Sequence, residues 1–290
     1  MVQGTLLKRY SGFYYVYAED RVWECSLRGR FRIKEQDFMT GDQVEILPGR
    51  GNQATIEKVK ERKNSLVRPS IANVDQALLV FALTTPVPDL NLLDRLLIQI
   101  EGVGITPIIV LTKLDLWEPK EEDEFLWDFY SRHWPLYKVS SRTSEGIAAL
   151  RGALSGKVSV LAGPSGVGKS SVLNALSSGL ELKTGDISQK SRRGRHTTRH
   201  VELLMCAEGL VADTPGFSSL YLPQMRREEL MHLFPEFDPY LGGCRFKTCL
   251  HDQEPDCQVK AGVEEGEIPQ FRYEHYRQFL KEVIAGERKY

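Results

Sequence analysis

The stretch GPSGVGKSSVLNAL, residues 163–176, constrains the fold of this chain more than any other segment. It follows the apolar run VSVLA and fits the pattern G-x-x-x-x-G-K-[ST], whose glycines let backbone N–H groups surround phosphate oxygens. Lys169 is placed to reach the β- and γ-phosphates and Ser170 to bind Mg²⁺, at a helix N-terminus that favours anions. The pattern predicts a strand, a phosphate loop and a helix. GPSGVGKS alone suits a nucleotide kinase or a transport ATPase equally well, so the base must be recognised elsewhere.

Around this loop, apolar strands such as ALLVFAL and TPIIVL alternate with helical stretches. Helices are expected near residues 90–102, 119–133, 144–154 and 169–178. This alternation is typical of an α/β domain with a parallel sheet. After Gly216 the chain changes to proline-punctuated helical segments that end in an amphipathic helix near 268–285.

Residues 1–68 consist of short alternating stretches broken by glycines. The stretches are GFYYVYA, RVWECSL, DQVEILP and ATIEKV. Such a series of short strands with turn residues between them predicts a small β-barrel. The charged segment KERKNSLVRPS then interrupts the alternation, and we interpret it as a linker.

Two further motifs lie on opposite sides of the phosphate loop. In a GTPase, an Asp-x-x-Gly motif that touches Mg²⁺ and the γ-phosphate normally follows the phosphate loop, and DTPG at 213–216 fits it. The guanine-reading motif [NT]-K-x-D normally comes next, yet nothing after residue 216 fits it. The motif lies upstream instead, in IIVLTKLD, and YKVSS supplies a serine loop downstream of it.

The chemistry of these upstream residues favours guanine. Asp115 can accept hydrogen bonds from the N1–H and the exocyclic 2-amine of guanine, a pair of donors that adenine lacks, while Lys113 can lie along the ring plane. The candidate residues for the base are Thr112, Lys113, Leu114, Asp115, Ser140 and Ser141. The candidates for the phosphates and Mg²⁺ are Gly163, Pro164, Ser165, Gly166, Val167, Gly168, Lys169, Ser170, Ser171, Asp213 and Gly216.

The motif order is base reader, serine loop, phosphate loop, switch and Asp-x-x-Gly. A sheet keeps its strand neighbours wherever the chain is cut, and permutation is tolerated where termini lie close together. The sequence therefore predicts a circularly permuted GTPase domain whose second switch leads directly into the C-terminal region.

A second site is indicated by C-x₄-C-x-H-x₅-C near the C-terminus. Its candidate metal ligands are Cys244, Cys249, His251 and Cys257. Three thiolates and one imidazole fill a tetrahedral Zn²⁺ shell and leave no position for water, so the site is expected to be structural. The alternative is a set of buried, reduced cysteines. Cys25 and Cys206 are expected in the core, and His232 and His275 at the surface or at helix caps.

Positive charge is concentrated in two segments although the net charge is −1. Residues 183–200 carry 6 Lys/Arg against 1 Asp/Glu, and residues 1–69 carry 13 against 9. The barrel combines Arg28, Arg30, Arg32 and Lys34 with Tyr14, Tyr15, Tyr17 and Trp23. Basic and aromatic side chains on a small barrel suit RNA, but strand alternation places about half of those aromatics in the core.

The chain resembles the bacterial ribosome small subunit-dependent GTPase A family over essentially its whole length. The resemblance is carried by RPSIANVDQ, TKLD, GPSGVGKSSVLNAL, GRHTTRH, DTPGF and CRFKTCLHDQEPDCQV. It implies an N-terminal OB-fold that binds RNA or ribosome (1–68), a permuted GTPase domain (69–220) and a helical zinc-binding domain (221–290). It also implies a monomer that binds GTP/GDP, the small ribosomal subunit and its rRNA late in subunit maturation, with hydrolysis stimulated by the subunit.

The residue after Asp-x-x-Gly is Phe217, which cannot orient the attacking water as a Gln does there in many small GTPases. The candidate replacement is His196 in the basic loop RRGRHTTRH, a role that the resemblance supports; the alternative is a residue that faces RNA or solvent. Thr197 and Thr198 both suit the switch hydroxyl that meets Mg²⁺, and we favour Thr198. Gly166 stands where some permuted GTPases have a potassium-binding Asn, which argues against potassium assistance.

Two rival functions remain to be weighed. A P-loop kinase is suggested by GPSGVGKS but disfavoured by TKLD and DTPG, and an RNA-binding scaffold with a vestigial nucleotide site is disfavoured by the intact motif residues. The apolar runs are too short for a membrane span, and MVQGTLLKRYSG lacks the layout of a signal peptide. We therefore expect a cytoplasmic protein without a membrane partner.

Overall fold

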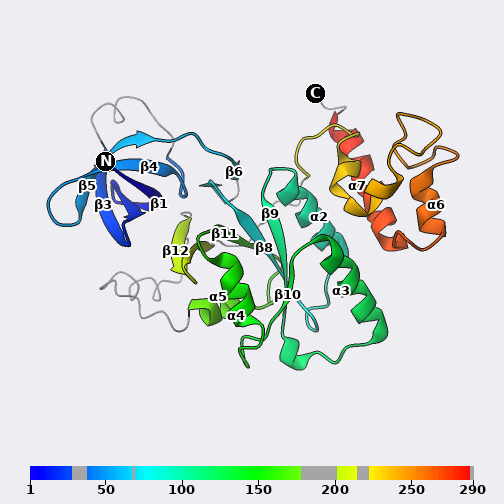
Figure 1. The fold of residues 1–290 in the computed structure, drawn as a ribbon, viewed down its shortest axis with the longest axis horizontal. Coiled ribbons are helices and arrows are strands. Elements are labelled where there is room, and N and C mark those ends of the chain that lie inside the picture. Colours follow the sequence, from blue (N-terminus) through cyan, green and yellow to red (C-terminus); the bar gives the residue numbers. More distant parts are fainter. Residues whose placement is uncertain (28–37, 67–68, 178–200, 214–221, 288–290) are drawn as a thin grey trace. The chain divides into compact units, whose positions relative to one another are not determined.

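The computed structural model describes residues 1–27, 38–66, 69–177, 201–213 and 222–287. The chain divides into two compact units, each built from separate segments (Figure 1). The first unit consists of Met1–Val87, Ile108–Trp117 and Tyr137–Ser219, and the second of Pro88–Pro107, Glu118–Leu136 and Leu220–Tyr290. No helix in the described segments is long and apolar enough to cross a bilayer.

The first unit begins with the predicted barrel. Its strands are β1 (Val2–Tyr10), β2 (Phe13–Ala18), β3 (Arg21–Leu27), β4 (Gln43–Pro48) and β5 (Gln53–Val59). They close in the order β1-β2-β3-β5-β4. Tyr14 and Trp23 are buried in the barrel core, whereas Tyr15 and Tyr17 stay partly exposed, as alternation requires. Arg28, Arg30, Arg32 and Lys34 lie outside the described residues.

A six-stranded sheet follows the barrel, and most of it belongs to the first unit (Figure 1). Its strands are β8 (Gln76–Ala82), β9 (Thr106–Thr112), β10 (Leu136–Lys138), β11 (Val158–Ala162), β12 (Glu202–Cys206) and β13 (Gly209–Asp213). Their order is β10-β9-β8-β11-β13-β12; β11 is parallel to β8 and to β13, and β12 is antiparallel to β13. A short pair, β6 (Ser65–Leu66) and β7 (Ile71–Ala72), precedes the sheet.

Two helices pack on one face of this sheet. α4 (Ile147–Leu154) contributes Leu150 and α5 (Lys169–Ser177) contributes Val172 to a core shared with alternate residues of β8. β11 is buried along its whole length and is paired with β8 on one side and β13 on the other, so its position in the sheet is fixed. The phosphate loop therefore starts from a rigid strand and leads into a packed helix.

The second unit is helical in its described residues. Its elements are α2 (Leu90–Glu101), α3 (Glu121–His133), the 3₁₀ turns η2 (Leu230–Leu233) and η3 (Pro235–Tyr240), α6 (Gln258–Glu264) and α7 (Gln270–Glu287). The Asp89 side chain caps α2 by accepting a hydrogen bond from Leu92 N at 3.0 Å. The core stacks Phe234 on Phe237, and both rings contact Tyr276 edge-on.

A buried ion-pair network centres on Arg272 of α7, which is 1% exposed. Arg272 Nη1 lies 2.5 Å from Asp94 Oδ1, and Nε lies 2.6 Å from Glu236 Oε1. Asp94 also accepts from the Tyr130 hydroxyl at 2.7 Å and lies 2.6 Å from His275 Nδ1. Burial opposes the charge on Arg272, but the two carboxylates raise its pKa above the ordinary value. Helices from distant parts of the chain are joined by fully desolvated charges.

The position of His275 corrects the sequence-based expectation. His275 was expected at the surface or at a helix cap, but its ring faces the buried carboxylate of Asp94. Tertiary packing, which leaves no local pattern in the sequence, brings a carboxylate from α2 beside it. His232 is exposed, in agreement with the expectation.

Replacing Arg272 with Met should destabilise the second unit by about 3–5 kcal/mol, because Asp94 and Glu236 would stay buried without their cation. Urea unfolding followed by tryptophan fluorescence, to which Trp127 and Trp134 of this unit contribute, measures the loss. The matched control is Arg277→Met on the same helix. Arg277 is 40% exposed and pairs with Asp252, so this change should cost at most about 1 kcal/mol. Equal stability of the two variants would contradict the assignment.

Candidate nucleotide site

The phosphate loop connects β11 to α5, as the motif predicts. Gly163 has φ +134°, and a Cβ there would lie 2.1 Å from the carbonyl oxygen of Val80 on the neighbouring strand. No other residue can take this position without moving β8. The glycine thus lets the loop leave the sheet at the carboxyl end of β11.

Lys169 at the start of α5 is held over this loop. Its Nζ donates to the carbonyl oxygens of Gly163 at 2.9 Å and Pro164 at 2.6 Å. Burial lowers the pKa of Lys169, because the ammonium is partly removed from water and no carboxylate is among the causes of its shift. Phosphate oxygens at the loop would supply the missing negative charge. Ser170 and Ser171 are exposed beside it.

The TKLD segment follows β9 and contacts the phosphate loop directly. The hydroxyl of Thr112, which is 2% exposed, lies 2.5 Å from Val167 O and 3.2 Å from Phe81 O. Lys113 adopts the left-handed conformation with φ +61°, and its Nζ lies 3.1 Å from Gly166 O. Two motifs that are distant in sequence therefore form one surface at the carboxyl ends of β9 and β11.

The serine loop after β10 completes this surface. Ser140 is fully buried and donates from Oγ to Asp115 Oδ1 at 2.5 Å. The same Oγ accepts from the backbone N–H groups of Arg142 and Thr143, which fixes its orientation. Leu114 N donates to Val139 O at 3.2 Å and joins the two loops a second time. Ser141 is half-buried next to them.

The sequence of the chain matches two models of protein families. A family model described as RsgA GTPase matches residues 59–223, more than half of the chain, and one described as RsgA N-terminal domain matches residues 3–56. The chain belongs to the RsgA GTPase family. Family membership makes it a GTP-hydrolysing enzyme with a circularly permuted GTPase domain and an N-terminal OB-like barrel.

Relatives of this family cover the whole chain. A protein of Moorella thermoacetica, named small ribosomal subunit biogenesis GTPase RsgA, is 51% identical over 100% of both chains, and one of Geobacillus kaustophilus with the same name is 48% identical over 100% of both. The crystal structure of YjeQ from Thermotoga maritima has a TM-score of 0.82 at 36% identity over 98% of each chain. YloQ, described as a circularly permuted GTPase, has a TM-score of 0.81 at 39% identity over 98% of this chain and 96% of its own.

The carboxylate of Asp115, the predicted guanine reader, has two partners. Ser140 holds Oδ1, and Arg142 Nε donates to Oδ2 at 2.6 Å. The hydrogen bond from Ser140, followed by that from Arg142, lowers the pKa of Asp115, so the side chain is a carboxylate near neutral pH. Arg142 was not predicted as a site residue. Its signal was a basic residue immediately after the Ser-Ser pair of the serine loop.

Several predicted residues of this RsgA-family site fall outside the described part. Asp213 ends β13, which runs parallel to β11, so its backbone lies at the same sheet edge as the phosphate loop. Gly216 and Phe217 lie outside the described residues, as do His196, Thr197 and Thr198. The catalytic assignments therefore stay predictions.

The predicted metal ligands come together in the second unit. The ligand atoms of Cys244, Cys249, His251 and Cys257 all lie within 4.8 Å of one another. His251 Nδ1 is 3.6 Å from Cys244 Sγ and 3.3 Å from Cys257 Sγ. Sulfur and nitrogen atoms bound to one Zn²⁺ at about 2.0–2.3 Å would be separated by distances in this range. The cluster can hold a metal ion.

Burial supports the same interpretation of the cluster. It raises the pKa of the Cys249 thiol to about 12, so this group would be protonated at neutral pH unless a cation stabilised its thiolate. The backbone around the ligands is tied to α7, since Tyr273 Oη donates to His251 O at 2.9 Å and Tyr276 Oη donates to Leu250 O at 2.7 Å. Three of the four ligand residues are buried, and a set of four protein ligands suits a structural metal.

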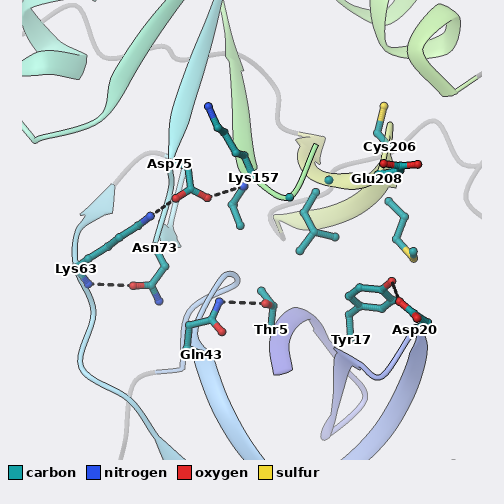
Figure 2. A pocket seen from close by; sticks show the side chains of 15 residues that line it. Thr5, Tyr17, Asp20, Gln43, Lys63, Asn73, Asp75, Lys157, Cys206 and Glu208 are labelled. Atoms are coloured by element: carbon teal, nitrogen blue, oxygen red, sulfur yellow. Dashed lines mark hydrogen bonds and ion pairs between the residues drawn. The ribbon is translucent and has the colours of Figure 1, made fainter. Parts of the chain in front are cut away.

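A cavity of about 760 Å³ lies elsewhere in the first unit, at the amino end of β11 (Figure 2). Labelled polar side chains around it pair with one another: Lys63 with Asp75, Gln43 with Thr5, and Tyr17 with Asp20. The phosphate and base loops lie at the carboxyl ends of the strands and do not line this cavity. It is therefore separate from the candidate nucleotide site.

Proposed function

We propose that this enzyme binds the small ribosomal subunit, assists its late maturation, and hydrolyses GTP to GDP and phosphate with stimulation by the subunit. The printed names of the relatives from Moorella and Geobacillus support the ribosomal role. The choice of a guanine nucleotide rests on the contacts of the TKLD segment. Thr112 donates a hydrogen bond to Val167 O of the phosphate loop, and Asp115 accepts one from Ser140 of the serine loop. A carboxylate in this place fits the donor pair of guanine and not the edge of adenine.

Each loop has a separate task in this proposal. Asp115 accepts the N1–H and amine of guanine, Ser140 orients that carboxylate, and Lys113 supports the ring plane. Lys169 moves from the carbonyls of Gly163 and Pro164 to the β- and γ-phosphates. Mg²⁺ supplies charge neutralisation when bound, and the Ser170 hydroxyl, with Asp213 and Gly216, would hold it and the γ-phosphate.

For the hydrolytic step we propose that His196 positions the attacking water and that the Thr198 hydroxyl meets the γ-phosphate side of the site. Both belong to a loop that also carries Lys190, Arg192, Arg193, Arg195 and Arg199. An rRNA surface that orders this basic loop would couple docking to hydrolysis. GTP then favours the subunit-bound state, and hydrolysis promotes release.

We also propose the division into an RNA-binding barrel (1–68), a GTPase domain (69–220) and a zinc domain (221–290), acting as a cytoplasmic monomer. The soft S₃N donor set of the cluster supports Zn²⁺ over harder cations. With four protein ligands the metal would have no open position, so its role would be to hold the C-terminal domain and not to take part in hydrolysis.

Purified enzyme should hydrolyse GTP slowly alone and at least about tenfold faster with small ribosomal subunits, since GTPase stimulation by partner surfaces can reach 10³-fold or more. Phosphate release with and without subunits measures this effect. Lys169→Ala should lose turnover in both conditions, and His196→Ala should lose mainly the stimulated part. Equal turnover with and without subunits would contradict the proposal, and phosphoryl transfer to an acceptor would favour a kinase.

A further inference from the structure

We propose that Arg142 is a specificity-determining residue of the base site, because its guanidinium holds the oxygen of Asp115 that the edge of guanine must engage. The inference rests on the proposed function, since it takes Asp115 as the guanine reader. It adds a residue of this chain that competes with the base and so sets how strongly the site prefers guanine.

The two carboxylate oxygens of Asp115 have partners that differ in burial. Oδ1 accepts from the fully buried Ser140 at 2.5 Å, and this hydroxyl is itself fixed by two backbone N–H groups. Oδ2 accepts from Arg142 Nε at 2.6 Å. The Asp115 side chain is 9% exposed and that of Arg142 is 70% exposed. Arg142 can therefore swing into solvent at little cost, whereas Ser140 cannot.

The two competitors present the same chemistry. A guanidinium is planar and donates parallel N–H groups to a carboxylate, and the N1–H and 2-amino groups of guanine form a planar pair of donors of the same kind. Oδ1 can accept a second hydrogen bond in addition to the one from Ser140. Oδ2 can accept its hydrogen bond either from Arg142 or from the base. Guanine, which needs both oxygens, must displace the guanidinium.

A base with a single donor on this edge behaves differently. Hypoxanthine keeps N1–H but lacks the 2-amino group, so it needs one carboxylate oxygen and leaves the other to Arg142. Arg142 therefore weakens guanine binding more than hypoxanthine binding and lowers the ratio of the two affinities. Exposed ion pairs are weak, and the corresponding change in affinity is about two- to fivefold.

The test is calorimetric titration of the full-length enzyme and its Arg142→Ala variant with GDP and with inosine diphosphate. The variant should bind GDP about two- to fivefold more tightly and inosine diphosphate with unchanged affinity. Lys157→Ala is the matched control, because it removes a cation from the amino end of β11 in the same unit. The control should leave the ratio of the two affinities unchanged.

Weaker GDP binding by Arg142→Ala, or an equal change for both nucleotides, would overturn the inference. Repeating the change in an Asp115→Asn background separates the role of Asp115 in binding the base from the role of Arg142. If Asp115→Asn leaves guanine preference intact, the proposed base site itself fails. If Asp115→Asn removes the preference while Arg142→Ala alone has no effect on the affinity ratio, only the role of Arg142 fails.

Discussion

Removal of the metal from the cluster of Cys244, Cys249, His251 and Cys257 should destabilise the second unit by several kcal/mol, on the order of 5. Without a cation the buried thiols become protonated, since burial already raises the pKa of Cys249 to about 12. The loops that carry the ligands would then no longer be held together by the metal. The backbone oxygens of these loops that accept hydrogen bonds from α7 would lose their fixed positions. Thermal unfolding before and after chelation, with metal content verified by elemental analysis, measures the effect.

Two variants make this test specific to the cluster. Cys257→Ser should reproduce the destabilisation and make the protein insensitive to chelator, whereas Cys25→Ala in the barrel core should leave the chelator effect unchanged. GDP affinity should be partly retained in the chelated protein, because the base and phosphate loops belong to the first unit. Unchanged thermal stability after verified metal loss would contradict a structural role.

Most strands and helices followed from the hydrophobic pattern, because the barrel strands alternate while the central sheet strands are continuous apolar runs. α2 (Leu90–Glu101) and α5 (Lys169–Ser177) lie within a few residues of their predicted bounds, as do the barrel strands β2 to β5. The strand β12 was not predicted. It pairs with β13 through a two-residue turn at Ala207 and Glu208, both with positive φ, and this turn lacks the Asn-Gly signature by which such hairpins are recognised.

Long-range charge pairing could not be predicted in the same way. Asp94, Glu236 and Arg272 each appear in sequence as an ordinary surface charge on a helix. They are buried because three helical segments converge, which depends on tertiary packing and leaves no local pattern. The domain boundaries at 68 and 220 stay a prediction for a related reason: α2 and α3 follow the α/β pattern but belong to the unit that contains the C-terminal helices.

The candidate site was more accessible to sequence reasoning than the fold around it. Thr112, Lys113 and Asp115 were chosen for their chemistry, and the structure places them against the phosphate loop and the serine loop. Their roles in nucleotide binding remain predictions until ligands are tested. Arg142 was missed because nothing in a single sequence shows which of many exposed arginines faces a particular carboxylate.

Asp115→Asn should lower GTP and GDP affinity by about 10³–10⁴-fold, since a site built to accept two N–H groups would then present an amide donor to one of them. The same change should favour xanthine nucleotides. Xanthine carries a carbonyl at C2, which accepts from the new amide NH₂, while the Asn oxygen can still accept from Ser140. Titration with GDP and with xanthosine diphosphate measures both directions of the switch.

An inversion of base preference cannot be explained by unfolding, because unfolding would lower the affinity for both nucleotides. Asp128→Asn is the isosteric control: it lies exposed on α3 and should leave both affinities unchanged. Loss of GDP binding without gain of xanthosine diphosphate binding, in a variant with normal thermal stability, would place Asp115 in a supporting role. An unchanged affinity for GDP would remove the base-reading assignment, because that assignment requires the Asp115 carboxylate to accept both guanine donors.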